Sequence, residues 1–367
     1  MSTVRQHTIE TPRVAHLVPA LFDPSDGIIG GAERYAFELA RHMAARTPTI
    51  LVTFGSGPDR HERIGDLDVA VLAARYIRGQ RTNPVSVALG AALRSADVIH
   101  CHQQHVLASS LAAAYARLTG RRVFVTELGG GGLDISTFLS TDRWFHGHLH
   151  ISEYSRQIFG HVNDRRDRVI LGGVDLTRFH PGTPAEGSGP VLFVGRILPH
   201  KGIHHLITAV GTDIPLRIIG RAADAVYLES LRRAAGPQVT FRHDCDDDAL
   251  VTEYRSASCV VLPSVYRTPD GSMTAIPELL GQTVLEAMAC ARPVICTRVA
   301  SLPEIVEDGV SGFVVAPEDP GALRAAIIRL RGDCGLSERF GSAGRALVVR
   351  KFQWNRVVDR CLSAYAA

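Results

Sequence analysis

The stretch VLFVGRILPHKG, residues 191–202, contains the pattern on which the fold prediction depends. Its short apolar run predicts a buried strand, and the glycine after it predicts a turn at the strand's end. Helical segments separate it from five further runs of the same kind. These are LRIIGR (216–221), VTFRHD (239–244), CVVLPS (259–264), PVICTR (293–298) and GFVVAP (312–317). Such alternation predicts βαβ units and a parallel sheet covered by helices on both faces.

The first half of the chain alternates in the same way. An amphipathic helix is expected over 32–45, and residues 180–190 (HPGTPAEGSGP) have the composition of a linker. The expected strands are 14–21, 49–55, 67–74, 97–103, 122–128, 148–154 and 168–171. We therefore predict an α/β protein with two doubly wound domains, in which ligands bind beyond the carboxyl ends of the strands.

Composition excludes several classes of protein. The chain has 367 residues, of which 46% are hydrophobic and 21% charged, so it is long enough for two globular domains. A net charge of +3 is too small to predict nucleic acid as a partner. No apolar run is long enough for a spanning helix, and the polar N-terminus does not resemble a secretory signal. The seven cysteines form no CxxC motif, which favours a reducing compartment, and we predict a cytoplasmic location.

Two segments carry groups that suit a bound phosphate. Gly30 and Gly31 precede a helix, where free N–H groups and the helix dipole favour an anion, although an ordinary turn would look the same. Arg196 and Lys201 lie in one loop after a strand, and Lys201 is one of only two lysines in the chain. Arginine offers a rigid fork and lysine a compact charge, but two solvated cations remain the alternative.

Two glutamates stand eight residues apart in PELLGQTVLEAM (277–288). Glu286 would lie inside a helix that begins near 281–283, and Glu278 in the loop before it. The first amides of that helix could hold a phosphate or a sugar, and the carboxylates could accept hydrogen bonds from hydroxyl groups. A capping loop with a surface glutamate is the alternative.

Histidines alternate along two expected strands. His100 and His102 share one face of the first strand, with His105 nearby, so they are candidates for a metal pair, a general base or polar core residues. His146, His148 and His150 alternate in the same way. We predict no metal site there, because the sequence places no carboxylate or cysteine cluster beside them.

A run of four glycines follows Glu127 at the end of another expected strand. It predicts either a mobile loop or a surface against which a ligand packs, and it does not fit a dinucleotide fingerprint. Asp246–Asp248 formally contain a DxD motif. A helical pattern follows directly, which favours helix capping over metal binding.

These motifs resemble glycosyltransferase family 4, whose members have the GT-B fold. The resemblance covers nearly the whole chain, and its specific part lies in the second half. It is carried, in order, by GGAER (30–34), VGRILPHKG (194–202), the two glutamates at 278 and 286, LEAMACARPVICTRVASLPEIVEDGVSGFVV (285–315) and FQWNRV (352–357). It implies two Rossmann-like domains facing across a cleft: 1–178 on the acceptor side and 191–350 on the donor side. A C-terminal helix, 351–367, would pack back on the N-terminal domain.

The resemblance implies a role for each donor-site residue. Arg196 and Lys201 would neutralise the diphosphate of a nucleotide sugar and stabilise the leaving group. Glu286 would accept hydrogen bonds from the ribose, and Glu278 would orient the donor sugar or stabilise positive charge at its anomeric carbon. The other donor-binding residues would be Gly30, Gly31, Gly281, Gln282 and Thr283.

The resemblance places the acceptor at the first domain. His102 matches a histidine near the reacting centre in some members and would position the acceptor or handle its proton, with His105 in reserve. We also expect acceptor contacts at Glu127, Gly129 and Gly130. The predicted catalytic residues are thus His102, Arg196, Lys201 and Glu278.

The implied reaction moves a sugar from a nucleotide-diphosphate sugar, with UDP favoured, to a hydroxyl of a glycan, a lipid-linked or a small-molecule acceptor. It would retain anomeric configuration by front-face displacement and need neither cofactor nor metal. A GT-B sugar-nucleotide epimerase, a non-catalytic sugar-nucleotide-binding protein and an NAD-dependent oxidoreductase remain alternatives.

The long segment VYRTPDGSMTAIPE (265–278) departs from the family pattern and would shape specificity. Arg75, Arg78 and Arg81 precede an apolar helix expected over 85–93. They would either contact the inner face of a membrane or be solvated.

Overall fold

The computed structural model describes residues 11–21, 31–76, 83–129, 135, 138–162, 164–182 and 189–367. The chain forms two compact units. Unit 1 contains the chain up to His150 together with 161–170 and 358–367, and unit 2 contains 151–160 and 171–357. The domain limits expected from the sequence, at 178, 191 and 351, stay predictions.

Unit 1 is built on an eight-stranded sheet in the order β10-β9-β8-β7-β1-β2-β4-β3. All neighbouring strands in it are parallel except β3, which pairs antiparallel with β4 at the edge. The strands are β1 (Val14–Leu21), β2 (Thr49–Gly55), β3 (Arg60–Ile64), β4 (Leu67–Ala73), β7 (Val98–His102), β8 (Arg122–Thr126), β9 (Gly147–His150) and β10 (Arg168–Val169). β5 (Arg75–Tyr76) and β6 (Pro84–Val85) form a separate ribbon.

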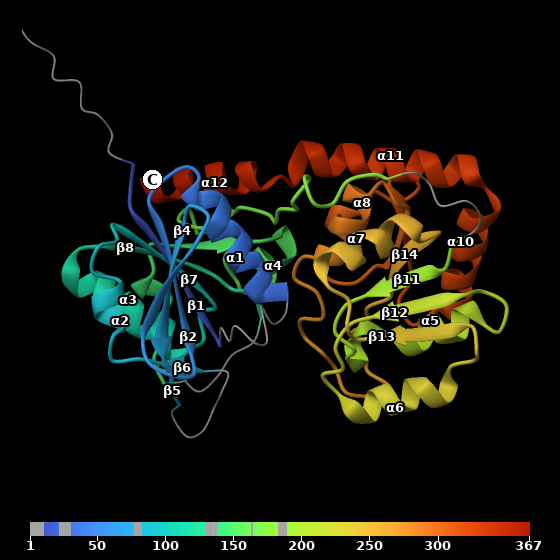
Figure 1. Ribbon diagram of the computed structural model, residues 1–367, viewed down its shortest axis with the longest axis horizontal. Helices are drawn as coiled ribbons and strands as arrows, with labels where there is room; N and C mark the ends of the chain where they lie inside the picture. Colours follow the sequence, from blue (N-terminus) through green and yellow to red (C-terminus); the bar gives the residue numbers. More distant parts are fainter. Residues whose placement is uncertain are drawn as a thin grey trace, which may run out of the picture. The chain divides into compact units, whose positions relative to one another are not determined.

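Helices cover both faces of this sheet. The helices before unit 2 are α1 (Gly31–Ala44), α2 (Leu89–Ala92) and α3 (Leu107–Thr119). Side chains along β4 alternate between two hydrophobic clusters. Val69 and Val71 join the cluster that contains α1 residues, whereas Ala70 and Leu72 join the cluster that contains residues of α2 and α3. In Figure 1, α2 and α3 accordingly lie on the opposite side of the sheet from α1.

Unit 2 contains a six-stranded, fully parallel sheet in the order β13-β12-β11-β14-β15-β16. The strands are β11 (Val191–Val194), β12 (Leu216–Ile219), β13 (Val239–Arg242), β14 (Cys259–Leu262), β15 (Val294–Thr297) and β16 (Gly312–Val315). The helices are α4 (Glu153–Ile158), α5 (Ile203–Val210), α6 (Ala225–Ala234), α7 (Asp247–Ser256), α8 (Gln282–Ala289), α9 (Leu302–Ile305), α10 (Pro320–Gly332) and α11 (Cys334–Lys351). Every strand expected in this half of the chain is confirmed.

The last helix, α12 (Trp354–Ala366), begins in unit 2 and continues in unit 1. Its unit 1 part is anchored by side chains from several elements. Arg122 Nη1 donates to the Tyr365 carbonyl, Arg360 Nη1 donates to the Ile170 carbonyl at 3.0 Å, and Arg46 pairs with Asp359 at 3.1 Å. These contacts tie the C-terminal residues to the unit 1 sheet.

The structure corrects the sequence analysis at two points and confirms it at another. The apolar helix expected over 85–93 is wrong in extent, because Val85 belongs to β6 and the helix in that range is limited to α2. The edge strand β3 was missed, because its sequence RHERI carries three charged residues and a histidine. Arg78, Arg81 and 183–188 of the predicted linker lie outside the described residues. Capping by Asp246 is confirmed: its carboxylate accepts a hydrogen bond from the Ala249 amide at 2.8 Å.

No helix in the described part of the chain is both long and apolar enough to cross a membrane.

Gly202 illustrates how closely β11 and β14 are joined. It caps α5 with a φ of +65°, and a Cβ there would lie 2.0 Å from the Pro263 carbonyl oxygen. We expect Gly202→Ala to lower the free energy of unfolding by about 3 kcal/mol, because left-handed strain of about 1–2 kcal/mol adds to a backbone clash. Gly309→Ala is the control: φ is +74° with open space around a Cβ, so only the strain applies. Urea unfolding measures both variants, and equal losses would contradict the clash.

Candidate functional site

Lys201 and Glu278 form an ion pair at the carboxyl edge of the unit 2 sheet. Lys201 ends the 3₁₀ turn Pro199–Lys201 after β11, and Glu278 lies in the loop between β14 and α8. The Lys201 Nζ contacts Glu278 Oε1, and the Ser264 hydroxyl donates to the same oxygen at 2.9 Å. Their side chains are only 13% and 9% exposed. The structure thus brings together two predicted catalytic residues 77 positions apart.

Neighbouring strands hold this pair in place. Ser264 follows β14, and its carbonyl accepts a hydrogen bond of 2.6 Å from the Thr297 hydroxyl at the end of β15. The Ser301 hydroxyl donates to the Glu278 carbonyl at 3.4 Å. Sequence analysis missed Ser264, although it closes the expected strand CVVLPS. A hydroxyl residue at the carboxyl end of a central strand is the signal that could have identified it.

The positive charge on the loop after β11 comes from Lys201 and Arg196 and not from His200. Burial, reinforced by the positive charge of Lys201, lowers the pKa of His200 to about 4, although Glu278 acts in the opposite direction. His200 is therefore neutral at pH 7. Arg196 follows β11 two residues after the strand ends and is exposed. An exposed arginine and a half-buried lysine on one loop can bind an anion.

The helix α8 begins where the sequence predicted. Gly281 is its N-cap with a φ of +81°, and a Cβ there would lie 2.7 Å from Leu302 Cδ2. Gln282 and Thr283 are the first two helical residues and are partly exposed. Backbone N–H groups in a first helical turn have no partner within the helix, so these residues offer donors to an anion or a hydroxyl.

Glu286 lies within α8 and is 3% exposed. Its Oε2 accepts a hydrogen bond of 2.8 Å from the Tyr254 hydroxyl of α7. Tyr254 is itself fully buried. The sequence did not predict Tyr254 as the partner of Glu286. Its hydroxyl fixes the orientation of the Glu286 carboxylate.

Three histidines cluster inside unit 1. His102 is 1% exposed, and its Nε2 lies 2.9 Å from His16 Nδ1 of β1. His100 uses both ring nitrogens, with Thr126 Oγ1 at 2.7 Å and the Tyr365 hydroxyl at 2.7 Å. This arrangement fits polar core residues for His100 and gives it no nitrogen for a metal. His102 Nδ1 is buried without a hydrogen-bond partner in the described part of the chain.

Burial sets the protonation of this cluster. It lowers the pKa of His16 to about 3 and takes the pKa of His100 and His102 well below the usual value. The positive charge of His16 would lower the pKa of His100 and His102 further, and that of His102 would lower the pKa of His100. All three are neutral near pH 7. His102 can therefore act there only as a neutral hydrogen-bonding group or as a weak base.

The predicted acceptor residues contact one another after β7 and β8. Glu127 is 7% exposed and accepts hydrogen bonds from the Gln104 amide at 2.7 Å and the Gly129 amide at 3.0 Å. Burial raises its pKa, although these amides act against the shift. Gly129 has a φ of +84°, and His105 lies half-buried on the neighbouring loop. Glu127 thus joins two loops at the carboxyl edge of the sheet.

The remaining predicted glycines divide into two groups. Gly31 is the exposed first residue of α1, and a Cβ there would meet open space, so local packing does not require glycine. Gly30 and Gly130 lie outside the described residues.

Comparison with known proteins identifies the class. Residues 29–178 match the model of Glycosyltransferase Family 4, and residues 178–347 match that of Glycosyl transferases group 1. The solved structure of sucrose-phosphate synthase from Thermosynechococcus elongatus resembles the chain with a TM-score of 0.72 at 21% identity, covering 96% of this chain and 98% of that one. Anabaena Alr3699/HepE in complex with UDP-glucose gives 0.73 at 19% identity, covering 96% and 100%. The chain is a glycosyltransferase with the GT-B fold.

Curated relatives agree with this class. Alpha-maltose-1-phosphate synthase of Mycobacterium tuberculosis is 28% identical over 320 residues, covering 75% of this chain and 80% of the relative. D-inositol 3-phosphate glycosyltransferase of Geodermatophilus obscurus is 33% identical over 245 residues, covering 59% and 51%. The two family models together span residues 29–347, and the chain belongs to glycosyltransferase family 4.

The buried histidines predict a pH-dependent stability. The folded pKa of His16 is about 3 and the unfolded value about 6.5, so the unfolded chain takes up a proton first as the pH falls below 6.5. The free energy of unfolding is therefore highest above pH 6.5 and decreases as the pH falls towards 3. Between pH 7 and 5 we expect His16 alone to account for a loss of about 2 kcal/mol, at 1.36 kcal/mol per pH unit.

Urea unfolding of His16→Asn at pH 7 and pH 5 tests this expectation. Asparagine places an amide nitrogen near the position of Nδ1 but does not titrate, so the variant should lose less stability on acidification than the wild type. His61→Asn, at an exposed position on β3, is the control and should behave as the wild type. An unchanged pH dependence in His16→Asn would contradict the assignment.

Proposed function

We propose that this glycosyltransferase moves a hexosyl group from a UDP-sugar to a hydroxyl of a glycan, lipid-linked or small-molecule acceptor, with retention of anomeric configuration. The observation that carries the proposal is the Lys201–Glu278 pair, held by Ser264 beside the first turn of α8. A cation, a carboxylate and free helix amides at one sheet edge suit a diphosphate joined to a sugar. Alr3699/HepE, which has been solved with UDP and with UDP-glucose, supports the choice of UDP.

Each group in unit 2 has a proposed part. Lys201 and Arg196 bind the diphosphate and neutralise the charge that grows on it as the glycosidic bond breaks. Glu278 orients the sugar and stabilises positive charge at the anomeric carbon. The amides of Gly281, Gln282 and Thr283 hold phosphate or sugar oxygens, and Glu286 accepts hydrogen bonds from the ribose.

The proposed bond changes occur on one face of the sugar. The acceptor oxygen bonds to the anomeric carbon as the bond from that carbon to the diphosphate oxygen breaks, and the acceptor proton passes to the departing phosphate. UDP and a glycoside of unchanged configuration are the products. His102 assists as a neutral hydrogen-bonding group, because its burial disfavours protonation. We include Gly30 and Gly31 on the donor side and His105, Glu127, Gly129 and Gly130 on the acceptor side of this proposal.

The location belongs to the same proposal. We propose that the protein acts in the cytoplasm without a cofactor, and that Arg75 and its neighbours offer a contact with the inner face of a membrane. Arg75 is exposed in β5, which agrees with such a contact and equally with a solvated side chain.

A thermal-shift panel tests the donor. UDP, UDP-glucose, GDP, ADP and NAD are each added without metal to the full chain. A ligand that binds only the folded state raises the melting temperature by mass action. We expect UDP and UDP-glucose to give the largest shifts. A larger shift with GDP or ADP would overturn the choice of base, and a shift with NAD alone would overturn the assignment of the site.

A double-mutant cycle separates the chemistry of the ion pair from its effect on stability. Lys201→Met or Glu278→Gln alone leaves one charge half-buried without its partner, so each should cost about 3 kcal/mol of unfolding free energy. The double variant removes both charges and should regain much of that stability. Turnover should nevertheless fall about 100- to 1,000-fold in all three, because the phosphate loses its cation or the sugar its carboxylate.

Stability is read from urea unfolding and turnover from UDP release with acceptor present. Near-normal turnover in the stable double variant would sink the site assignment. The anomeric configuration of the product, determined by NMR, tests retention, and an inverted product would contradict front-face displacement.

A further inference from the structure

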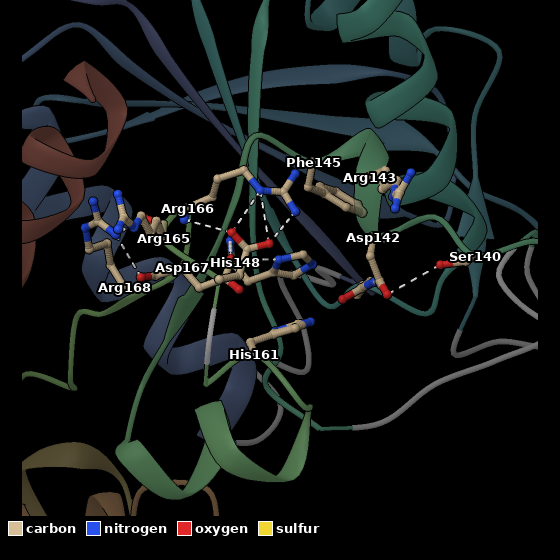
Figure 2. Close-up of polar contacts among 12 residues, drawn as sticks. Ser140, Asp142, Arg143, Phe145, His148, His161, Arg165, Arg166, Asp167 and Arg168 are labelled. Atoms are coloured by element: carbon tan, nitrogen blue, oxygen red, sulfur yellow. Dashed lines mark hydrogen bonds and ion pairs between the residues drawn. The ribbon is translucent and has the colours of Figure 1, made fainter.

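A second cluster of histidines in unit 1 differs from the first because carboxylates accompany it. Asp142, His148 and His161 each offer a ligand atom, and these atoms all lie within 4.8 Å of one another. Asp142 comes from the 3₁₀ turn Asp142–Trp144, His148 from β9, and His161 from the segment after α4. Figure 2 shows the three side chains close together, with Asp167 beside His148 on the side away from Asp142.

We propose that Asp142, His148 and His161 bind a divalent transition-metal ion, with Zn²⁺ favoured. Two imidazoles and a carboxylate suit zinc, which takes nitrogen and oxygen ligands in a tetrahedral arrangement. Asp142 is exposed, whereas His148 is only 4% exposed. Water could therefore reach the ion from the side of Asp142 and fill the fourth position. No property of the donor site enters this proposal.

His148 provides the strongest support. Its Nδ1 lies 3.0 Å from Asp167 Oδ1, so the ring donates that proton to a fully buried carboxylate. The same carboxylate oxygen accepts the His148 backbone amide at 2.8 Å. His148 Nε2 is then left buried without a hydrogen-bond partner among the described residues. A carboxylate–histidine pair that leaves Nε2 unpartnered is the usual support for a metal-binding histidine.

His161 and Asp142 are held in a comparable way. His161 Nδ1 lies 3.1 Å from His150 Nε2, which can accept its proton and so leave His161 Nε2 for an ion. The Asp142 Oδ1 accepts a hydrogen bond from the Gln104 side chain, and its Oδ2 accepts one of 3.4 Å from the Ser140 hydroxyl. All three ligands therefore have a supporting partner, as metal ligands generally do.

Two carboxylates lie at the cluster itself. Figure 2 also shows four arginines around it, Arg143, Arg165, Arg166 and Arg168, of which Arg166 is paired with Asp164 through Nε at 3.0 and 3.1 Å. Asp142 and Asp167 are the groups that would balance the charge of the ion. Zinc bonds of about 2.0–2.1 Å place tetrahedral ligands about 3.3 Å apart, so atoms at the 4.8 Å limit would move inward by about 1.5 Å. Movement of the exposed Asp142 and of the half-buried His161 can supply this.

Two other candidate trios within unit 1 fit a metal less well. His100 in the trio with His16 and His102 already uses both ring nitrogens. The trio of His150, His161 and Asp167 would break the hydrogen bond that joins the two histidines. The sequence predicted no metal here because it placed no carboxylate beside His148; folding places two there.

The test measures metal content and affinity of the full chain, with any polyhistidine tag removed. After treatment with EDTA and dialysis, the protein is titrated with Zn²⁺ against a chromophoric chelator, with Co²⁺ for its visible spectrum and with Mg²⁺ as the hard-cation control. We expect one Zn²⁺ per chain, a tetrahedral Co²⁺ spectrum, no competition by Mg²⁺, and a melting temperature that rises with Zn²⁺.

Three variants locate the ion. His148→Ala and Asp142→Asn should abolish binding, and the exposed position of Asp142 makes its variant safe for folding. Asp167→Asn should weaken binding about 10- to 100-fold through the orientation of His148. His61→Ala, an exposed histidine on β3, is the matched control and should bind as the wild type. Absence of Zn²⁺ binding in the wild type, or unchanged binding in folded Asp142→Asn, would overturn the proposal.

Discussion

The Lys201–Glu278 ion pair is the constraint on which the geometry at the carboxyl edge of the unit 2 sheet depends. The charged side chains of Lys201 and Glu278 are 13% and 9% exposed, so removing them from water is costly. They are tolerated only when the two charges contact each other and further hydrogen bonds satisfy their remaining donors and acceptors. Ser264 supplies one such bond, and Thr297 fixes Ser264. The ends of three adjacent strands are therefore tied to one pair of charges. A phosphate arriving beside Lys201 would meet a cation already oriented, which limits the entropy lost on binding.

The same edge shows why glycines stand where they do. Gly202 and Gly281 both begin helices with positive φ, and a Cβ on either would overlap atoms of neighbouring segments. α5 and α8 can therefore start close to the strand ends, which brings their first amides to the carboxyl edge. Backbone donors and the ion pair come from different parts of the sequence, but the packing of the parallel strands gives them one location.

Much of the fold was predictable, because parallel strands buried on both faces are continuous apolar runs. β1 and β2 coincide with the predicted ranges for that reason, whereas β3 was missed because an exposed edge strand can consist of charged residues. Motif order predicted site residues at 201, 278 and 286, but not the hydroxyl groups that hold the two glutamates. Ser264 and Tyr254 meet those glutamates only through tertiary packing, and no spacing in the sequence encodes such contacts.

The two histidine clusters of unit 1 show how the surroundings determine the chemistry of one residue type. In the first cluster, the hydrogen bonds of His16, His100 and His102 among the described residues go to one another and to hydroxyl groups, so burial keeps the rings neutral and we expect stability to fall with acid. In the second, Asp167 accepts the proton on His148 Nδ1, which leaves the buried Nε2 as the nitrogen available to an ion. Alternating histidines along a strand look alike in both segments of sequence. The difference is Asp167, which lies 19 positions from His148 in the sequence and hydrogen-bonds its Nδ1. In our proposal this contact makes His148 a metal ligand and not a core residue.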